Sequence, residues 1–214
     1  KAAKRADRDA AEGLSIAKSS ADNTYGIVVE VNCETDFVAK NDDFVAFANK
    51  IADIALDQKF ADRDALLATP FDGKTLGEIL IDKTAVIGEK IDVSNYALVS
   101  SEGVAAYNHG ANRIGVLVAL NSNEESALQA GRDLAMQIAA MNPIAVDETS
   151  VSQEVKDKEL EIGRDIARQE GKPEEMLDKI AQGKLQRFYK DSTLMHQAFV
   201  KDSSMTVAAF LKTV

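Results

Sequence analysis

The chain has 214 residues, with 25 Lys and Arg against 35 Asp and Glu, so its formal net charge is −10. This acidity argues against a duplex nucleic-acid partner, because phosphate contacts need clustered basic side chains. One cysteine (Cys33) excludes an intramolecular disulfide framework, and two histidines are too few for an ordinary structural zinc site. No apolar run approaches about 18 residues, so we expect no membrane-spanning helix.

The first hundred residues are predicted to form strands followed by helices. Alternating β-branched residues make Tyr25–Val31 the strongest strand signal, and Ala21-Asp22-Asn23 has the composition of a turn. The predicted elements are a charged helical stretch over 1–11, strands over 13–19 and 25–31, a helix from about Phe37 to Leu56, a shorter helix over 76–86 and a strand over 91–101.

The order strand, strand, helix then occurs again, with strands over 104–107 and 113–120 and a helix over 124–141. The second copy resembles the first in sequence. The matched segments are Glu12-Gly13 with Glu102-Gly103, 26–32 with 115–121, and 47–52 with 134–139. We infer an α+β fold with two related subdomains, each an antiparallel sheet with a helix across one face. Coincidence between two ordinary hairpin–helix units is the alternative.

The segment 151–191 has 19 charged residues and no strand pattern. Gly171-Lys172-Pro173 separates two helical patterns, since Gly suits a helix end and Pro a helix start. We predict an inserted antiparallel coiled-coil hairpin, with apolar positions at Val155, Ile162, Ile166, Met176, Leu177, Ile180 and Phe188. The predicted subdomains are therefore 1–100, and 101–150 with 192–214. A short edge strand at 199–200 and a final helix over 206–212 follow the hairpin.

No constellation of residues indicates catalysis, so we expect a protein that is not an enzyme and needs no cofactor or metal. Cys33 ends the strongest strand and is interpreted as a small buried residue. Nothing in the sequence places His109 or His196 near it, although a hydrolase using Cys33 or His109 is the rival hypothesis. Glycine-rich nucleotide-binding loops are absent from the sequence.

The most unusual local stretch is Thr35-Asp36-Phe37-Val38. Thr35 or Asp36 can cap the following helix, because a side-chain oxygen accepts an otherwise unpaired backbone N–H. Phe37 then stands in the first helical turn. Two interpretations remain open at this point: a core residue that staples the helix start, or an exposed aromatic wedge that enters a pocket on another protein.

Three segments of the chain closely resemble bacterial elongation factor Ts: 25–41 (YGIVVEVNCETDFVAKN), 107–117 (YNHGANRIGVL) and 171–188 (GKPEEMLDKIAQGKLQRF). The resemblance implies a cytoplasmic guanine-nucleotide exchange factor that binds elongation factor Tu·GDP and promotes GDP release. It assigns the dislodging of the partner's Mg²⁺ to Thr35, Asp36, Phe37 and Val38. The family also has an N-terminal domain, so a chain that begins at Lys1 is interpreted as a fragment.

The resemblance implies further contacts with the partner at Ile87, Gly88, His109, Gly110 and Val200. His109 would reach the phosphate-loop side of the GTPase, and Asn112 lengthens the loop after it. Lys201 replaces a Met of some members, and its aliphatic stem can still lie on a surface. No nucleic acid or membrane is implied as a partner. The alternative function is a non-catalytic scaffold that forms a homodimer through the helical hairpin.

Overall fold

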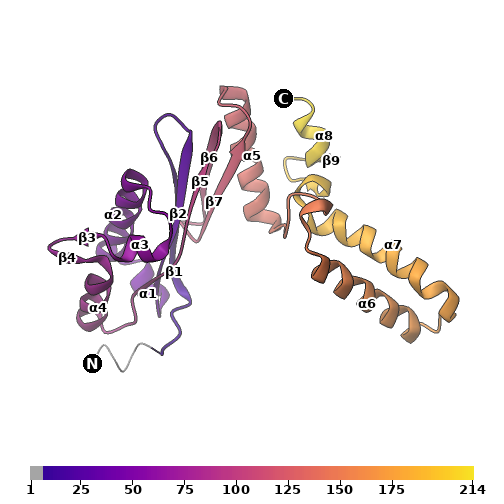
Figure 1. The fold of residues 1–214 in the computed structure, drawn as a ribbon, viewed down its shortest axis with the longest axis horizontal. Helices are drawn as coiled ribbons and strands as arrows, with labels where there is room; N and C mark the ends of the chain where they lie inside the picture. The colour runs from indigo at the N-terminus through magenta and orange to yellow at the C-terminus, as the bar shows by residue number, and fades with distance from the viewer. Residues whose placement is uncertain (1–6) are drawn as a thin grey trace. The chain divides into compact units, whose positions relative to one another are not determined.

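A computed structural model describes residues 7–214 (Figure 1). Helices and small antiparallel sheets confirm the α+β class. The strands are β1 (Glu12–Ser19), β2 (Tyr25–Cys33), β3 (Pro70–Phe71), β4 (Lys74–Thr75), β5 (Asp92–Ser100), β6 (Gly103–His109), β7 (Ile114–Leu120), β8 (Ala198–Phe199) and β9 (Asp202–Thr206). The helices are α1 (Asp36–Ala39), α2 (Asp42–Gln58), α3 (Arg63–Leu67), α4 (Leu76–Ile87), α5 (Glu125–Met141), α6 (Gln153–Gln169), α7 (Glu174–Ser192) and α8 (Val207–Leu211), with short 3₁₀ turns at Glu148–Ser150 and Leu194–His196.

The expected helix over 1–11 lies mostly outside the described residues. Its described part, 7–11, is not helical. Most of the other predicted elements lie close to their expected positions, because alternating and helical hydrophobic periods are strong signals in this chain.

β2 is the central strand of an antiparallel sheet ordered β1-β2-β5. Glu12 pairs with Cys33 at one end of the β1–β2 ladder. Alternate residues of β2, including Ile27 and Val29, are fully buried and belong to a core shared with the helices that follow. α2 packs on β1 and β2 and covers this face of the sheet.

The hairpin β6–β7 covers the other face of the same sheet (Figure 1). β6 and β7 pair antiparallel, from Gly103 opposite Leu120 to His109 opposite Ile114. α5 packs on the far side of this hairpin, where Gly131 lies against Leu120 and Ala105. The units β1–β2–α2 and β6–β7–α5 are therefore stacked sheet to sheet, which agrees with the predicted repeat.

The edge of β1 that does not pair with β2 is covered by residues of the β6–β7 hairpin and its loop. Asn108 pairs its side-chain amide with Ala17, accepting from the backbone N–H at 2.8 Å and donating to the carbonyl at 2.9 Å. The N–H of Ser15 donates to the carbonyl of Asn112 at 2.7 Å. These contacts satisfy edge groups of β1 that would otherwise be open to pairing with another chain.

The single helix predicted from Phe37 to Leu56 is wrong, because the chain forms α1 and α2 with a break at Lys40 and Asn41. The side chain of Asn41 accepts from the backbone N–H groups of Asp43 and Phe44, which begins a new helix there. Asparagine is a strong N-cap residue, and this cap separates α1 from the helix that covers the sheet.

The chain divides into two compact units, one ending at Ala139 and the other formed by Ala140–Val214. The grouping of 101–150 with 192–214 into one subdomain stays a prediction. In the second unit α6 and α7 pack antiparallel, with ion pairs from Arg164 to Asp178 at 2.6 Å and from Arg168 to Glu174 at 3.1 Å.

The contact face of this helical hairpin matches the predicted one in part. Leu177 is buried as expected, and Val155 and Phe188 pack on the cluster around Leu185. The buried positions of the hairpin also include the small residues Gly163, Ala167 and Ala181, and a Cβ at Gly163 would lie 3.0 Å from the Cα of Ala181. Small side chains let the two backbones approach closely. Ile162 and Ile166 are partly exposed instead, and the coiled-coil supertwist stays a prediction.

Candidate functional site

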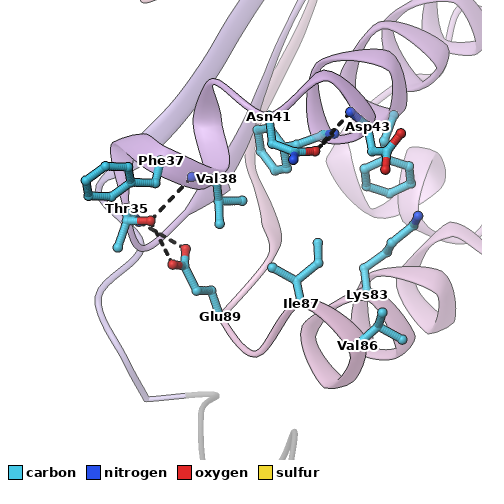
Figure 2. A pocket seen from close by; sticks show the side chains of 11 residues that line it. Thr35, Phe37, Val38, Asn41, Asp43, Lys83, Val86, Ile87 and Glu89 are labelled. Carbon is cyan, nitrogen blue, oxygen red and sulfur yellow. Dashed lines mark hydrogen bonds between the residues drawn. The ribbon is translucent and has the colours of Figure 1, made fainter.

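Phe37 lies at the end of β2, on the first turn of α1, with 83% of its surface exposed (Figure 2). The interpretation of this residue as a buried staple is therefore wrong. The hydroxyl of Thr35 accepts from the backbone N–H of Val38 at 3.4 Å and so begins α1. An aromatic ring exposed on a capped turn is available to a partner protein.

Glu89, which the sequence analysis did not identify, supports this turn from the segment between α4 and β5. Its Oε2 atom accepts from the backbone N–H groups of Glu34 and Thr35, both at 3.1 Å. Its Oε1 atom accepts from the Thr35 hydroxyl at 2.7 Å (Figure 2). Glu89 and Thr35 are far apart in the sequence, so no local pattern could have revealed this contact.

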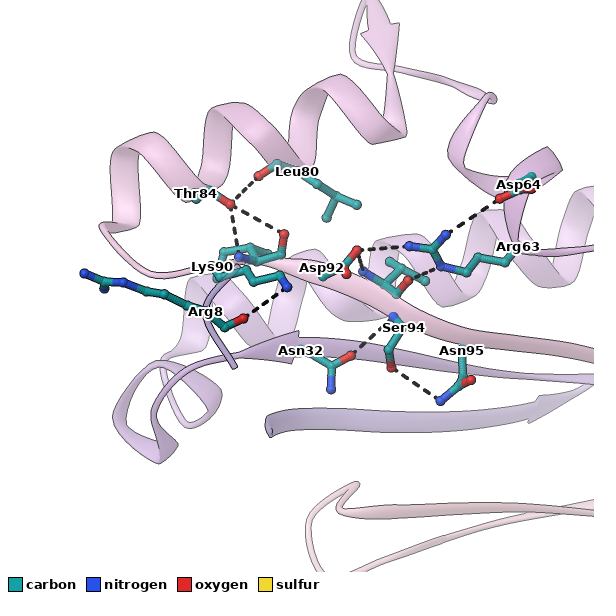
Figure 3. Close-up of polar contacts among 12 residues, drawn as sticks. Arg8, Asn32, Arg63, Asp64, Leu80, Thr84, Lys90, Asp92, Ser94 and Asn95 are labelled. Carbon is teal, nitrogen blue, oxygen red and sulfur yellow. Dashed lines mark hydrogen bonds and ion pairs between the residues drawn. The ribbon is translucent and has the colours of Figure 1, made fainter. Parts of the chain in front are cut away.

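The conformation of the turn that carries Ile87 and Gly88 is fixed at both of its ends. Gly88 has φ +87°, a left-handed conformation that favours glycine, and ends α4. The hydroxyl of Thr84 donates to the carbonyl of Leu80 at 2.9 Å and accepts from the N–H of Ile91 at 3.0 Å (Figure 3). The predicted site residues Ile87 and Gly88 therefore occupy a defined turn next to Glu89.

A cavity of about 590 Å³ lies between this turn and the start of α2. Phe37, Val38 and Ile87, predicted separately as partner contacts, all line it, as do Val86 and Lys83 (Figure 2). Exposed apolar side chains around a concavity are typical of protein interaction sites. The structure thus brings two of the predicted contact segments together.

Asp36 stands beside Phe37 and is exposed to solvent. A hydrogen bond from Lys40 at 2.7 Å, the charge of Lys40 and the charge of Arg113 hold the pKa of the Asp36 carboxyl below its usual range. The carboxylate is therefore ionised at neutral pH, and the exposed aromatic ring has a permanent negative charge next to it.

The turn with His109 and Gly110 joins β6 to β7. Nδ1 of His109 lies 2.9 Å from the Tyr107 hydroxyl. Arg113, just beyond the turn, forms an ion pair with Glu12 at 3.7 Å, and Glu12 pairs with Cys33 at the end of β2. The His109 turn therefore lies at the same end of the stacked sheets as Phe37.

Val200, the remaining predicted contact, follows β8 in the second compact unit and is 43% exposed. Its neighbour Phe199 is buried and stacks on Phe210, with ring centroids 4.2 Å apart. The structure therefore anchors this segment through Phe199 and leaves Val200 at the surface.

Cys33 is fully buried, and burial, followed by the nearby charge of Glu89, raises the pKa of its thiol to about 11. The thiol donates to the carbonyl of Thr35 at 3.2 Å. A buried thiol that is hard to ionise is a poor nucleophile. This finding argues against the rival hypothesis of a hydrolase that uses Cys33.

Within residues 7–214 there is no group of three or more His, Cys, Asp or Glu side chains placed to hold a metal ion. In the same part of the chain, no helix combines the length and apolar character needed to cross a membrane.

The fold is an α+β domain that contains two strand–strand–helix units, and the site places an exposed aromatic ring beside a cavity. The sequence model of the family described as Elongation factor TS matches residues 34–214. The chain is 49% identical to elongation factor Ts of Christiangramia forsetii and 45% identical to that of Flavobacterium psychrophilum, covering all of this chain and 77% of each relative. Elongation factor Ts of Porphyromonas gingivalis is 44% identical, over 99% of this chain and 76% of its own length. The chain belongs to the elongation factor Ts family, whose members are elongation factors of protein biosynthesis.

Proposed function

We propose that this protein is a guanine-nucleotide exchange factor for elongation factor Tu. It binds the GDP-bound GTPase in the cytoplasm, promotes GDP release and makes or breaks no covalent bond. The proposal rests on one observation: Phe37 is exposed on a turn that Thr35 and Glu89 hold in place. The membership of the elongation factor Ts family supports it.

In this proposal, Phe37 enters the GTPase near its Mg²⁺ and phosphate site. Burying an exposed Phe side chain contributes roughly 1.5–3 kcal/mol to binding, and this energy is available to displace elements of the partner. Mg²⁺ requires nearly ideal octahedral geometry, so small shifts of its ligands weaken its binding. Thr35 and Val38 set the direction of the wedge, and Asp36 brings a carboxylate next to the disturbed cation.

The remaining predicted contacts of the first unit extend the surface around Phe37. Ile87 and Gly88 lie beside the wedge, and His109 with Gly110 lies at the same end of the stacked sheets, so one partner surface can meet them together. Val200 adds a contact from the second unit. Coupling between two ligands of one protein is reciprocal. The exchange factor therefore weakens the binding of GDP to the GTPase by the same ratio by which GDP weakens the binding of the exchange factor.

The test measures GDP release directly. Elongation factor Tu loaded with fluorescent GDP is mixed with rising concentrations of the chain, and release is followed by stopped-flow fluorescence. We expect a release rate that rises with the chain's concentration and is opposed by added Mg²⁺. A chain that binds the GTPase and leaves the release rate unchanged contradicts the proposal.

A second candidate function, a homodimeric scaffold, is supported by the hairpin of α6 and α7. Ile162, Ile166 and Met176 are 40%, 37% and 44% exposed there. Sedimentation of the chain would show a dimer that Ile162→Glu with Ile166→Glu converts to a monomer. Gln182→Glu, an exposed change on the same hairpin, is the matched control. A chain that is monomeric at all concentrations contradicts this function.

A further inference from the structure

Two glutamates, Glu34 and Glu89, each accept hydrogen bonds from the backbone segment that carries the other. The Glu89 carboxylate accepts from the N–H groups of Glu34 and Thr35, and the Glu34 carboxylate accepts from the N–H of Lys90 at 2.7 Å. Each side chain therefore caps the segment that carries the other. We propose that this reciprocal pair, the glutamate clamp, positions Phe37 for nucleotide exchange, with Glu89 as the principal positioning residue. The inference rests on the proposed function.

The clamp depends on the chemistry of a carboxylate. Glu89 accepts three hydrogen bonds, one of them from the Thr35 hydroxyl, and an ionised carboxylate is a strong acceptor with no donor of its own. Because the hydroxyl proton points to Glu89, the oxygen lone pairs remain for the N–H of Val38. Glu89 thereby orients the cap that begins α1.

Phe37 needs such support because the residues around its side chain do little to fix its orientation. Its ring is largely exposed, so it has few packing contacts to fix its direction. α1 has four residues, which is too short to be stable without outside contacts. The position of the ring is therefore set by the backbone of Glu34 and Thr35, which Glu89 holds. A wedge ordered before binding loses less entropy when the complex forms.

The Glu34 half of the glutamate clamp links a second predicted contact segment, Ile87 and Gly88, to the backbone that carries Phe37. The Lys90 N–H that Glu34 holds comes just after the turn of Ile87 and Gly88. Arg8 adds a second layer, since its guanidinium binds Glu34 at 3.2 Å. Its carbonyl accepts from Nζ of Lys90 at 3.1 Å (Figure 3). The wedge and the Ile87 turn are thus presented to the partner as one unit.

The test is a double-mutant cycle on the full chain. Glu89→Ala is expected to lower the second-order rate constant of GDP release about tenfold, as the loss of hydrogen bonds to a charged group implies. In the Phe37→Ala background the same change is expected to have less than about a twofold effect, because no wedge remains to be positioned. An equal loss in both backgrounds overturns the proposal. Glu102→Ala, an exposed change in the same unit, is the control and is expected to match the wild type.

Amide hydrogen exchange provides a readout that does not depend on elongation factor Tu. In Glu89→Ala the amides of Glu34 and Thr35 are expected to exchange at least about tenfold faster than in the wild type and in Glu102→Ala. Unchanged protection of both amides overturns the clamp even if the wild-type chain promotes GDP release. Loss of protection in a chain that does not promote release instead overturns the proposed function. Should Glu89→Ala fail to fold, Glu89→Gln is measured in its place, since its amide group can no longer accept every one of these bonds.

Discussion

Gly26 and Gly115 lie 89 residues apart, and each faces a side chain of the other repeat. A Cβ at position 26 would lie 2.9 Å from Cδ2 of Leu117, and a Cβ at position 115 would lie 3.1 Å from Cγ2 of Val28. Leu117 follows Gly115 by two residues, as Val28 follows Gly26. The contact between the repeats is therefore reciprocal, as in a two-fold interface.

The first prediction concerns this contact. Gly26→Ala is expected to lower the free energy of unfolding by about 1–3 kcal/mol, because the added methyl group also lies 2.9 Å from the carbonyl of Lys18. Urea denaturation measures the change. Gly183→Ala is the control, since a Cβ there meets nothing within 4 Å, and it is expected to gain up to about 1 kcal/mol of stability in a helix. Equal stability of Gly26→Ala and the wild type would be inconsistent with a close-packed interface.

The second prediction concerns the reactivity of Cys33. Because burial raises the pKa of this thiol to about 11, its thiolate fraction near pH 8 falls about 100-fold, and alkylation of the native chain is expected to be slower by at least that factor than in urea. The rates are measured with a thiol-specific reagent. Equal rates in the native and unfolded chains would show that the thiol is accessible and ionisable.

The raised pKa of Cys33 also predicts a dependence of stability on pH. Above the ordinary thiol pKa the unfolded chain loses its proton first, so this group's contribution to stability falls as the pH rises toward about 11. Cys33→Ala removes this contribution. Its unfolding free energy, measured by denaturation at several pH values, is expected to fall less steeply than that of the wild type over the same range.

The third prediction concerns Asp36 and its partner Lys40. Lys40→Met removes the hydrogen bond and the charge that lower the pKa of Asp36, so this pKa is expected to rise toward its usual value. The carboxyl titration is followed by NMR. Lys50→Met, which removes an ion pair with Asp72 in the same unit, serves as the control. A pKa of Asp36 that does not move in Lys40→Met would show that other groups hold the carboxylate.

Much of the fold was predictable because its signals are local. Alternation of β-branched residues indicated β2 and β7, and the Gly171-Lys172-Pro173 sequence indicated the turn between α6 and α7. The break between α1 and α2 was missed, although Asn41 followed by two aspartates is an N-cap signal. The seam of the hairpin was predicted in part: Leu177 is buried there as expected, and the small residues of the seam, which carry little hydrophobic signal, were missed.

The sequence named candidate residues of the site but not their support. The local pattern singled out Phe37 and the resemblance added Ile87, and their meeting at one cavity required the fold. Glu89 carried no signal, because its contact with Thr35 joins segments separated by the four helices α1 to α4 and the short strand pair β3–β4. Exposure excluded the interpretation of Phe37 as a buried staple, and sequence patterns do not determine the exposure of a single aromatic residue.

The most direct test of the proposed function compares two exposed apolar residues of the same unit, Phe37 at the wedge and Ile81, which is 60% exposed on α4 and does not line the cavity. Both alanine variants are expected to melt at the wild-type temperature, because neither side chain belongs to the core. With elongation factor Tu carrying fluorescent GDP, Phe37→Ala is expected to lower the acceleration of GDP release at least about tenfold, as for a central interface aromatic. Ile81→Ala is expected to match the wild type. Wild-type acceleration by Phe37→Ala, or an equal loss in both variants, would contradict the account.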